Sequence, residues 1–259
     1  MITLEQREFF EENGYLKISN LLTNEEVAYY QNLYEDFLSN RIDASRYRSD
    51  LGGHIDDNTS ATTERITQIM VPSRVVPDLL SKSLHLKTDA LAKQLMGEDM
   101  ALDFDMLIDK PPFSDTPTPW HQDCAYWINM PDKRAVSCWV SLDEAKLENG
   151  CMWYVPGSHL QPMRSHQPAG KGGGALECQA TEEEGVAVEL QPGECVLHHG
   201  GTLHYSRGNS TDLRRRAFIT NFRPGAMIAL EREQGYDHTG ERAVRATEAS
   251  DSLQPNNEV

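Results

Sequence analysis

The chain has 259 residues, which is long enough for one large domain with a substantial core. Its Asp and Glu residues number 40 against 24 Lys and Arg, so the formal net charge is −16. A surface with this charge repels phosphate backbones and anionic lipids, and we therefore expect neither nucleic acid nor a membrane as a partner. The acidic N-terminus and the lack of an apolar run of about 18 residues lead us to expect a cytoplasmic protein.

The five cysteines are predicted to be reduced thiols. They are odd in number, lie far apart and include no C-x-x-C pair, at positions Cys124, Cys138, Cys151, Cys178 and Cys195. This pattern is typical of core thiols rather than of disulfides or a zinc cluster.

The first 97 residues are predicted to be mostly helical. Capping-box spacing, T-x-x-Q at residues 3–6 and T-x-x-E at residues 23–26, marks the starts of two helices. The segment "YLKI" between them and the β-branched "RITQIMV" at residues 65–71 are predicted strands. A further helix is expected over residues 77–96, followed by a glycine at the position of a C-terminal cap.

From residue 98 to 224 the sequence predicts a mainly β structure. Short apolar runs such as "MALDFDMLI", "AVSCWVSL" and "ECVLHH" alternate with turn signals. The sequence "ENG" at residues 148–150 fits a hairpin turn, and "QPGE" at residues 191–194 fits a type II turn. Many short strands at this spacing favour an antiparallel sandwich or jelly roll, with the N-terminal helices packed outside it.

We expect a single domain over residues 1–230, and two segments of the chain are not expected to belong to its core. Residues 161–176 include "GKGGG", are too rich in glycine for a core, and are predicted to form a mobile surface loop or a lid. Residues 231–259 are polar and are predicted to form a peripheral tail.

The segment "PWHQDCAYW", residues 119–127, contains a candidate metal site. If it is a strand, His121 and Asp123 project to one face and Gln122 to the other. One more histidine from a neighbouring strand would give two imidazoles and a carboxylate, which suit non-haem Fe(II) and are also compatible with zinc. On its own the H-x-D pattern is a weak signal, because a polar surface pair has the same sequence.

A second segment supplies the missing ligand and a candidate anion-binding residue. "HHGGTLH", residues 198–204, offers His198, His199 and His204 as the third ligand. Arg215 follows in the strand-like "RRRAFITNF". A buried arginine there would need a partner such as a carboxylate, so a metal site beside it indicates a dicarboxylate cosubstrate.

Four motifs occur in a fixed order between about residues 8 and 224. They are "FFEENGYLKI", "PWHQDCAYW", "CWVSLDEAKLENGCMWYVPGSH" and "LHYSRGNSTDLRRRA". In this order they resemble the phytanoyl-CoA dioxygenase-like family of Fe(II)- and 2-oxoglutarate-dependent oxygenases. The resemblance implies a double-stranded β-helix, a form of jelly roll, which uses Fe(II), 2-oxoglutarate and O₂.

The resemblance also implies roles for individual residues. The metal ligands are His121, Asp123 and His204; His204 is preferred because the "HxS" sequence and the arginine eleven residues later match the family there. Arg215 is implied to bind the distal carboxylate of 2-oxoglutarate. Arg214 and Arg216 have the opposite strand parity and are expected to face solvent or the sheet exterior. The cosubstrate pocket is implied to include Ser206, Trp139, Met106, Gln68 and Gln122.

The expected activity is hydroxylation of an unactivated C–H bond in a small metabolite, with release of succinate and CO₂. Candidate substrate contacts are Tyr126, Trp127, Asp105 and the loop around His54. We expect a monomer or a homodimer. One competing hypothesis is a non-catalytic jelly-roll protein that retains a metal or a carboxylate ligand for structure or sensing. The other is a cupin-like isomerase or hydrolase, which would need no cosubstrate arginine.

The remaining histidines are expected to have no part in the site. His159 in "PGSH" is predicted to be a structural turn residue, and solvent or loop positions are predicted for His54, His85, His166 and His238.

Overall fold

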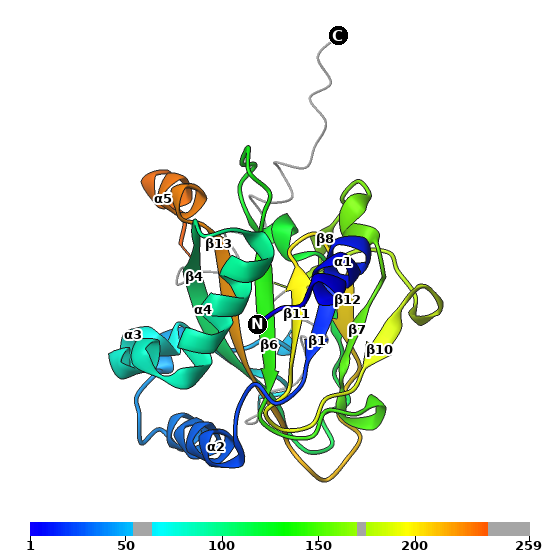
Figure 1. Ribbon diagram of the computed structural model, residues 1–259. Coiled ribbons are helices and arrows are strands. Elements are labelled where there is room, and N and C mark those ends of the chain that lie inside the picture. Colours follow the sequence, from blue (N-terminus) through cyan, green and yellow to red (C-terminus); the bar gives the residue numbers. More distant parts are fainter. Residues whose placement is uncertain (54–63, 170–174, 238–259) are drawn as a thin grey trace.

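The computed structural model describes residues 1–53, 64–169 and 175–237, and within them the chain is mainly β with flanking helices, as expected. Two antiparallel sheets form the centre of the molecule, and the larger helices lie outside the larger sheet (Figure 1). The predictions for His54, for His238 and for part of the glycine-rich loop lie outside the described residues.

The larger sheet has seven strands, in the spatial order β1 (Tyr15–Ile18), β11 (Cys195–His199), β6 (Val136–Ser141), β13 (Arg215–Pro224), β4 (Met100–Lys110), β3 (Thr67–Met70) and β2 (Arg48–Asp50). The smaller sheet has four, in the order β10 (Val186–Val188), β7 (Met152–Tyr154), β12 (His204–Ser206) and β5 (Thr118–His121). A short ribbon pairs β8 (Gln167–Pro168) with β9 (Leu176–Glu177).

The helices are α1 (Leu4–Asn13), α2 (Asn24–Leu38), α3 (Pro72–Val75), α4 (Ser83–Met96) and α5 (Gly225–Glu233). Both predicted capping boxes are present, because the hydroxyls of Thr3 and Thr23 accept from the backbone three residues on, and those residues reach back. Single 3₁₀ turns occupy Ser45–Tyr47, Pro77–Ser81, Asp123–Tyr126, Leu147–Asn149, Ser158–Leu160 and Glu182–Glu184.

Three predicted boundaries are corrected. The helix expected from residue 77 is a 3₁₀ turn followed by a break at Lys82, whose ψ of 160° is extended, and α4 starts only at Ser83. At "ENG" only Gly150 has positive φ, so the turn is a 3₁₀ turn closed by glycine rather than a two-residue hairpin. The chain remains packed beyond residue 230, because α5 extends to Glu233 and Glu231 is fully buried.

Other local predictions are confirmed. The "QPGE" turn has its glycine at φ 84°, and the backbone N–H of Glu194 donates to the carbonyl of Gln191 over 3.0 Å, as a type II turn requires. All five cysteines are unpaired.

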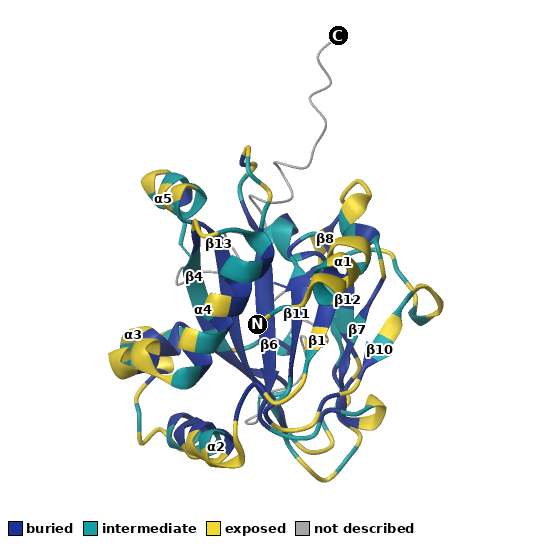
Figure 2. Ribbon diagram, viewed as in Figure 1, coloured by how far each residue is buried: buried dark blue, intermediate teal, exposed yellow. Residues whose placement is uncertain are grey.

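Two apolar cores result from the alternation of side chains along the central strands. On β6, Cys138 and Val140 face the helical layer, where they pack with Tyr30 of α2 and Leu91 of α4. Trp139 faces the opposite way and packs in the core between the two sheets. Figure 2 shows the central strands buried along their length, whereas the outer faces of the helices are exposed. A cavity in the core between the sheets holds the candidate site.

Candidate active site

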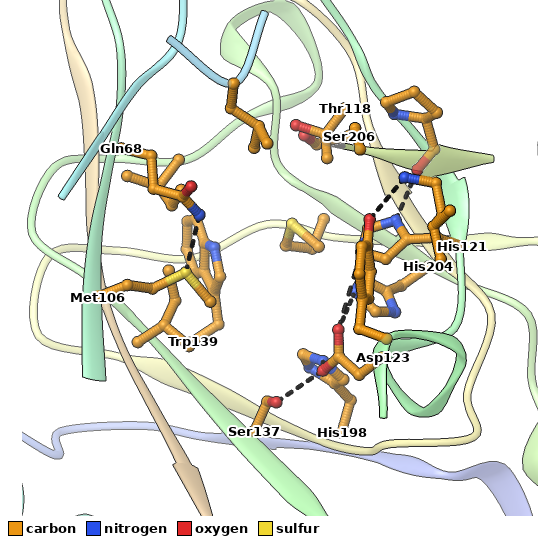
Figure 3. Close-up of a pocket in the computed structure, with 18 of the residues that line it drawn as sticks. Gln68, Met106, Thr118, His121, Asp123, Ser137, Trp139, His198, His204 and Ser206 are labelled. Atoms are coloured by element: carbon orange, nitrogen blue, oxygen red, sulfur yellow. Dashed lines mark hydrogen bonds and ion pairs between the residues drawn. The ribbon is translucent and has the colours of Figure 1, made fainter. Parts of the chain in front are cut away.

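His121, Asp123 and His204 converge at the edge of the smaller sheet. His121 is the last residue of β5, and its partner directly across the ladder is His204 on β12, so the two rings lie side by side with centroids 4.1 Å apart. The strand ends at His121 rather than continuing through Asp123 as predicted. Gln122 is still extended, however, and this returns Asp123, the first residue of a 3₁₀ turn, to the same face. One ligand atom from each residue lies within 4.8 Å of the other two (Figure 3).

Backbone hydrogen bonds orient both imidazoles. Nδ1 of His121 lies 2.7 Å from the carbonyl of Pro119, and Nδ1 of His204 lies 2.9 Å from the carbonyl of Thr202. A carbonyl can only accept, so each Nδ1 carries the proton and each Nε2 presents a lone pair to the centre of the site. Burial, with neighbouring imidazoles, lowers the pKa of His204 well below its ordinary value, which keeps it neutral and ready to bind a metal.

The two oxygens of Asp123 have different partners. Oδ2 accepts from the hydroxyl of Ser137 over 2.7 Å and from Nε2 of His198 over 3.2 Å. Oδ1 faces the ligand histidines, 3.5 Å from Nε2 of His204 and 3.8 Å from Nε2 of His121. Burial acts to raise the pKa of Asp123, but the histidines and these hydrogen bonds outweigh it and hold the pKa below its ordinary value. The side chain is therefore a carboxylate with one oxygen directed to the metal position.

His198 supports this arrangement from behind. It is buried, lines the cavity, and its Nδ1 lies 3.4 Å from the hydroxyl of Tyr154 while its Nε2 bonds Asp123. In the sequence it competed only as a possible third ligand, and the structure groups His204 with His121 and Asp123 instead. The sequence does not indicate that His198 contacts Asp123. His198 lies on β11 and Asp123 follows β5, so only the folded sheets bring the two side chains together.

Arg215 is a buried cation without a partner of its own. It is 1% exposed, and its Nε and Nη1 have no hydrogen-bond partner among the described residues. Its guanidinium lies 5.2 Å from the ring centre of Trp139, and burial lowers its pKa to about 10, so it remains protonated at neutral pH. The flanking arginines face outward as predicted: Arg214 is ion-paired with Asp109, and Arg216 with Asp143 and Glu35. An unpaired buried guanidinium indicates a site for an anion.

One cavity of about 150 Å³ joins the metal position to Arg215. Figure 3 shows Gln68, Met106 and Trp139 facing the triad across it, with the amide of Gln68 3.3 Å from the sulfur of Met106. The predicted residues that line this cavity are His121, Asp123, His204, Arg215, Ser206, Trp139, Met106, Gln68, Tyr126 and Trp127.

Two predicted contacts are wrong. Asp105 lies on the opposite face of β4 from Met106, fully buried, and bonds His85 and Ser73 instead of a substrate. Gln122 points away from the cavity, because its amide donates to the carbonyl of Gly201 and accepts from the backbone of Arg164.

Two histidines expected at loop or solvent positions are buried. His85 bonds the carboxylate of Asp105 over 2.9 Å. His166 accepts from the backbone N–H of Gln122 over 3.0 Å. His159 occupies a 3₁₀ turn as predicted, where its Nε2 bonds the carbonyl of Glu11.

The donor set fits iron. Two imidazole nitrogens and one carboxylate oxygen, with no thiolate among them, form the facial arrangement used by non-haem Fe(II) enzymes. The unpaired Arg215 in the same cavity fits a cosubstrate that carries a carboxylate.

Fold and site together define a jelly-roll protein with a facial-triad metal centre. Residues 10–217 match the phytanoyl-CoA dioxygenase family. The match covers most of the sequence, and the chain belongs to this family. The prediction made from the four motifs is confirmed.

Individual relatives agree with this assignment. The chain is 27% identical over 237 residues to the peroxisomal phytanoyl-CoA dioxygenase of Bos taurus, covering 86% of this chain and 68% of the relative. It is 28% identical over 233 residues to a probable alpha-ketoglutarate-dependent hypophosphite dioxygenase of Stutzerimonas stutzeri, covering 86% and 78%. The crystal structure of EvdO2 from Micromonospora carbonacea var. aurantiaca with 2-oxoglutarate aligns with a TM-score of 0.69 and 28% identity, covering 86% of this chain and 91% of that chain.

The solved structure confirms the jelly-roll fold, and both it and the Stutzerimonas stutzeri relative are described with 2-oxoglutarate (alpha-ketoglutarate), the cosubstrate expected for the family. Among the described helices, none has both the length and the apolar character that crossing a membrane requires.

Proposed function

We propose that the protein is an Fe(II)- and 2-oxoglutarate-dependent oxygenase that hydroxylates an unactivated C–H bond of a small molecule. The substrate, O₂ and 2-oxoglutarate would give the alcohol, succinate and CO₂, with one oxygen atom entering the alcohol and the other entering succinate. The observation that carries the proposal is the unpaired guanidinium of Arg215 in the same cavity as the triad. A hydrolase, or an isomerase that works without 2-oxoglutarate, would have no use for it.

The chain's own groups bind and orient the reactants. Nε2 of His121, Nε2 of His204 and Oδ1 of Asp123 would hold iron, which supplies the activation of O₂ and the oxidation of the C–H bond. Arg215 would bind the far carboxylate of 2-oxoglutarate through its buried guanidinium, and Ser206, also buried in the cavity wall, would donate its hydroxyl.

Burial of the end of the cavity beside Arg215 strengthens recognition of the cosubstrate. Arg215 and Ser206 are both almost fully buried, so little water competes for the carboxylate. The ring of Trp139 lies against the guanidinium and fixes its plane, which favours a two-pronged contact with one carboxylate.

An anaerobic titration tests the proposal. Iron-loaded protein should develop a weak metal-to-ligand charge-transfer band in the visible when 2-oxoglutarate is added, and the band should be absent in His121→Ala, which lacks one ligand nitrogen. His159→Ala is the matched control, because His159 lies outside this cavity and should leave the band intact. Wild-type protein that binds iron and shows no band would refute the oxygenase and favour a metal-binding protein of another kind.

Small molecules as partners, a cytoplasmic location, and a monomeric or homodimeric state are retained as proposals alongside this function. The first of these rests on the enclosed cavity of the site.

A further inference from the structure

The described part of the cavity wall has few ionisable side chains, and each of them is assigned to the metal, to the cosubstrate or to a hydrogen bond within the chain. Among the described residues, the ionisable side chains that line it are Tyr126, His121, Asp123, His198, His204 and Arg215. Three of these would hold the metal, Arg215 faces the cosubstrate, and His198 bonds Asp123. The hydroxyl of Tyr126 accepts from the backbone N–H of Leu176 over 2.8 Å. The described wall therefore leaves no charged group for a substrate.

The charges of the loaded site would also balance. The two positive charges of Fe(II) and the one of Arg215 would be matched by Asp123 and by the two carboxylates of 2-oxoglutarate, since imidazoles bind metals in their neutral form. A third reactant entering this cavity would find no net positive potential from the assembled site.

The substrate has to use the end of the cavity away from Arg215, and strand register locates that end. Arg215 pairs with Lys110 on β4, whereas Phe104 lies 110 − 104 = 6 residues along the same strand. At about 3.3 Å per residue this separates the two positions by roughly 20 Å. Trp127 belongs to the Phe104 end, because Arg223 near the far end of β13 lies over its ring at 4.8 Å.

The wall at this end is aromatic and aliphatic. Phe104, Tyr126, Trp127 and Leu176 line it, and Tyr126 reaches Leu176 through its hydroxyl. Such a surface gains free energy by covering apolar groups. It would leave a carboxylate, phosphorus oxyanion or zwitterion without a counter-charge, and burying such a charge is costly.

We propose that the group oxidised belongs to an uncharged, mainly apolar molecule, such as one with an alicyclic, aromatic or branched alkyl group, and that small anions are not substrates. This inference rests on the proposed function. It differs from what similarity alone suggests, since one relative is named for hypophosphite, an anion. The formal charge of −16 also disfavours a polyanionic carrier such as coenzyme A at the mouth of the cavity.

One apolar group in several charge states tests the proposal. The probes are cyclohexylacetamide, cyclohexylacetate, the coenzyme A thioester of the same acid, and hypophosphite. Each is titrated anaerobically into the Fe(II) and 2-oxoglutarate complex, and the shift of the charge-transfer band gives its affinity. The amide should bind roughly tenfold or more tightly than cyclohexylacetate and than the coenzyme A thioester. Hypophosphite should leave the band unchanged. The reason is that the charged probes lose hydration on entering the cavity without gaining a partner there.

A positive charge introduced into the cavity wall should reverse the order of affinity for the amide and cyclohexylacetate. Phe104 is partly exposed, so Phe104→Lys can hold its ammonium at the rim and should favour cyclohexylacetate over the amide. Phe104→Leu is the matched control and should retain the wild-type preference. Tighter binding of cyclohexylacetate, the thioester or hypophosphite to the wild type, equal affinities, or no shift with the amide would overturn the inference. Failure of the band to form before any probe is added would instead refute the proposed function.

Discussion

Two arginines on β13 are equally buried but differ in what balances their charge. Arg215 and Arg223 are each 1% exposed, and each guanidinium lies over a tryptophan ring, at 5.2 and 4.8 Å. Arg223 is ion-paired with Asp103 and Glu231, both of them buried. Arg215 has two N–H groups with no partner in the described structure.

The difference separates a structural arginine from one that we propose to bind a ligand. The carboxylates of Arg223 come from the chain, so they are present as soon as β13, β4 and α5 have folded together. The anion for Arg215 has to come from solution. Burial and ring stacking are common to both residues, and only the missing counter-charge distinguishes the ligand site.

Arg223→Met should have the largest effect, on folding. The substitution keeps the side-chain volume but leaves the buried Asp103 and Glu231 with only the partly exposed Arg232 as a shared cation. We expect the free energy of unfolding to fall by about 3–5 kcal/mol, measured by urea denaturation. Arg134→Met, at partly exposed ion pairs with Asp99 and Asp132, is the control and should cost about 1 kcal/mol. Equal stability of the two variants would contradict the structural role of Arg223.

The same substitution at Arg215 should act on binding instead. Arg215→Met removes an unpaired buried charge, so the ligand-free protein should be as stable as the wild type or more so. Binding of 2-oxoglutarate, measured anaerobically by calorimetry with metal present, should weaken by about 2–5 kcal/mol. Arg214→Met is the matched neighbour and should keep the affinity. If Arg214→Met loses it and Arg215→Met does not, the cosubstrate contact is assigned to the wrong face of β13.

Asp123 has one carboxylate oxygen with hydrogen-bond partners in the chain and one directed to the metal position. A substitution at His198 tests whether the paired oxygen positions the other. The Oδ2 of Asp123 has partners within the chain, as Arg223 has, while its Oδ1 faces the metal position. His198→Phe removes one hydrogen bond to Oδ2 and should weaken Fe(II) or Co(II) binding by about tenfold in an anaerobic titration. His198→Gln can still donate and should restore most of the affinity. Equal metal binding by both variants would show that this hydrogen bond does not position Asp123.

A pH-dependent effect is expected from Asp109, whose charge acts on both Arg214 and Arg215. Burial raises its pKa to about 6, although the nearby arginines oppose this. Between about pH 6 and the ordinary value near 3.8, the folded protein holds a proton that the unfolded chain has released. Stability from this group therefore increases as the pH falls through 6 and is lost as the pH rises.

Comparison with Asp109→Asn isolates this contribution. The free energy of unfolding of the wild type, relative to that of the variant, should rise on the order of 2 kcal/mol from pH 7 to pH 4. A difference that stays constant over this range would show that Asp109 is ionised throughout.

The residues that we propose to bind metal and cosubstrate could be predicted because their signals lie along short stretches of sequence. The family resemblance indicated Arg215, and strand parity then placed its two neighbours on the opposite face. The H-x-D spacing needs only an extended Gln122 to bring both candidate ligands to one face. These are local properties of the chain.

The errors concern residues whose partners lie far away in the sequence. Nothing in "ALDFDMLID" shows which face of β4 meets the cavity, and Asp105 is buried on the other face because His85 and Ser73 bond it there. The contact of His198 with Asp123 depends on the pairing of whole strands. Glu231 was assigned to a tail because its acidic side chain gives no sign of the buried Arg223 that pairs with it.

The direct pairing of His121 with His204 has a consequence for assembly of the chain. β5 is the outermost strand of the smaller sheet and is joined to β12 through only two register pairs, with an irregularity between them. A metal ion held across these histidines closes a loop of 204 − 121 = 83 residues. A bound metal ion would therefore also cross-link β5 to β12. Removing it with a chelator should increase amide hydrogen exchange in β5 before it increases exchange in the seven-stranded sheet.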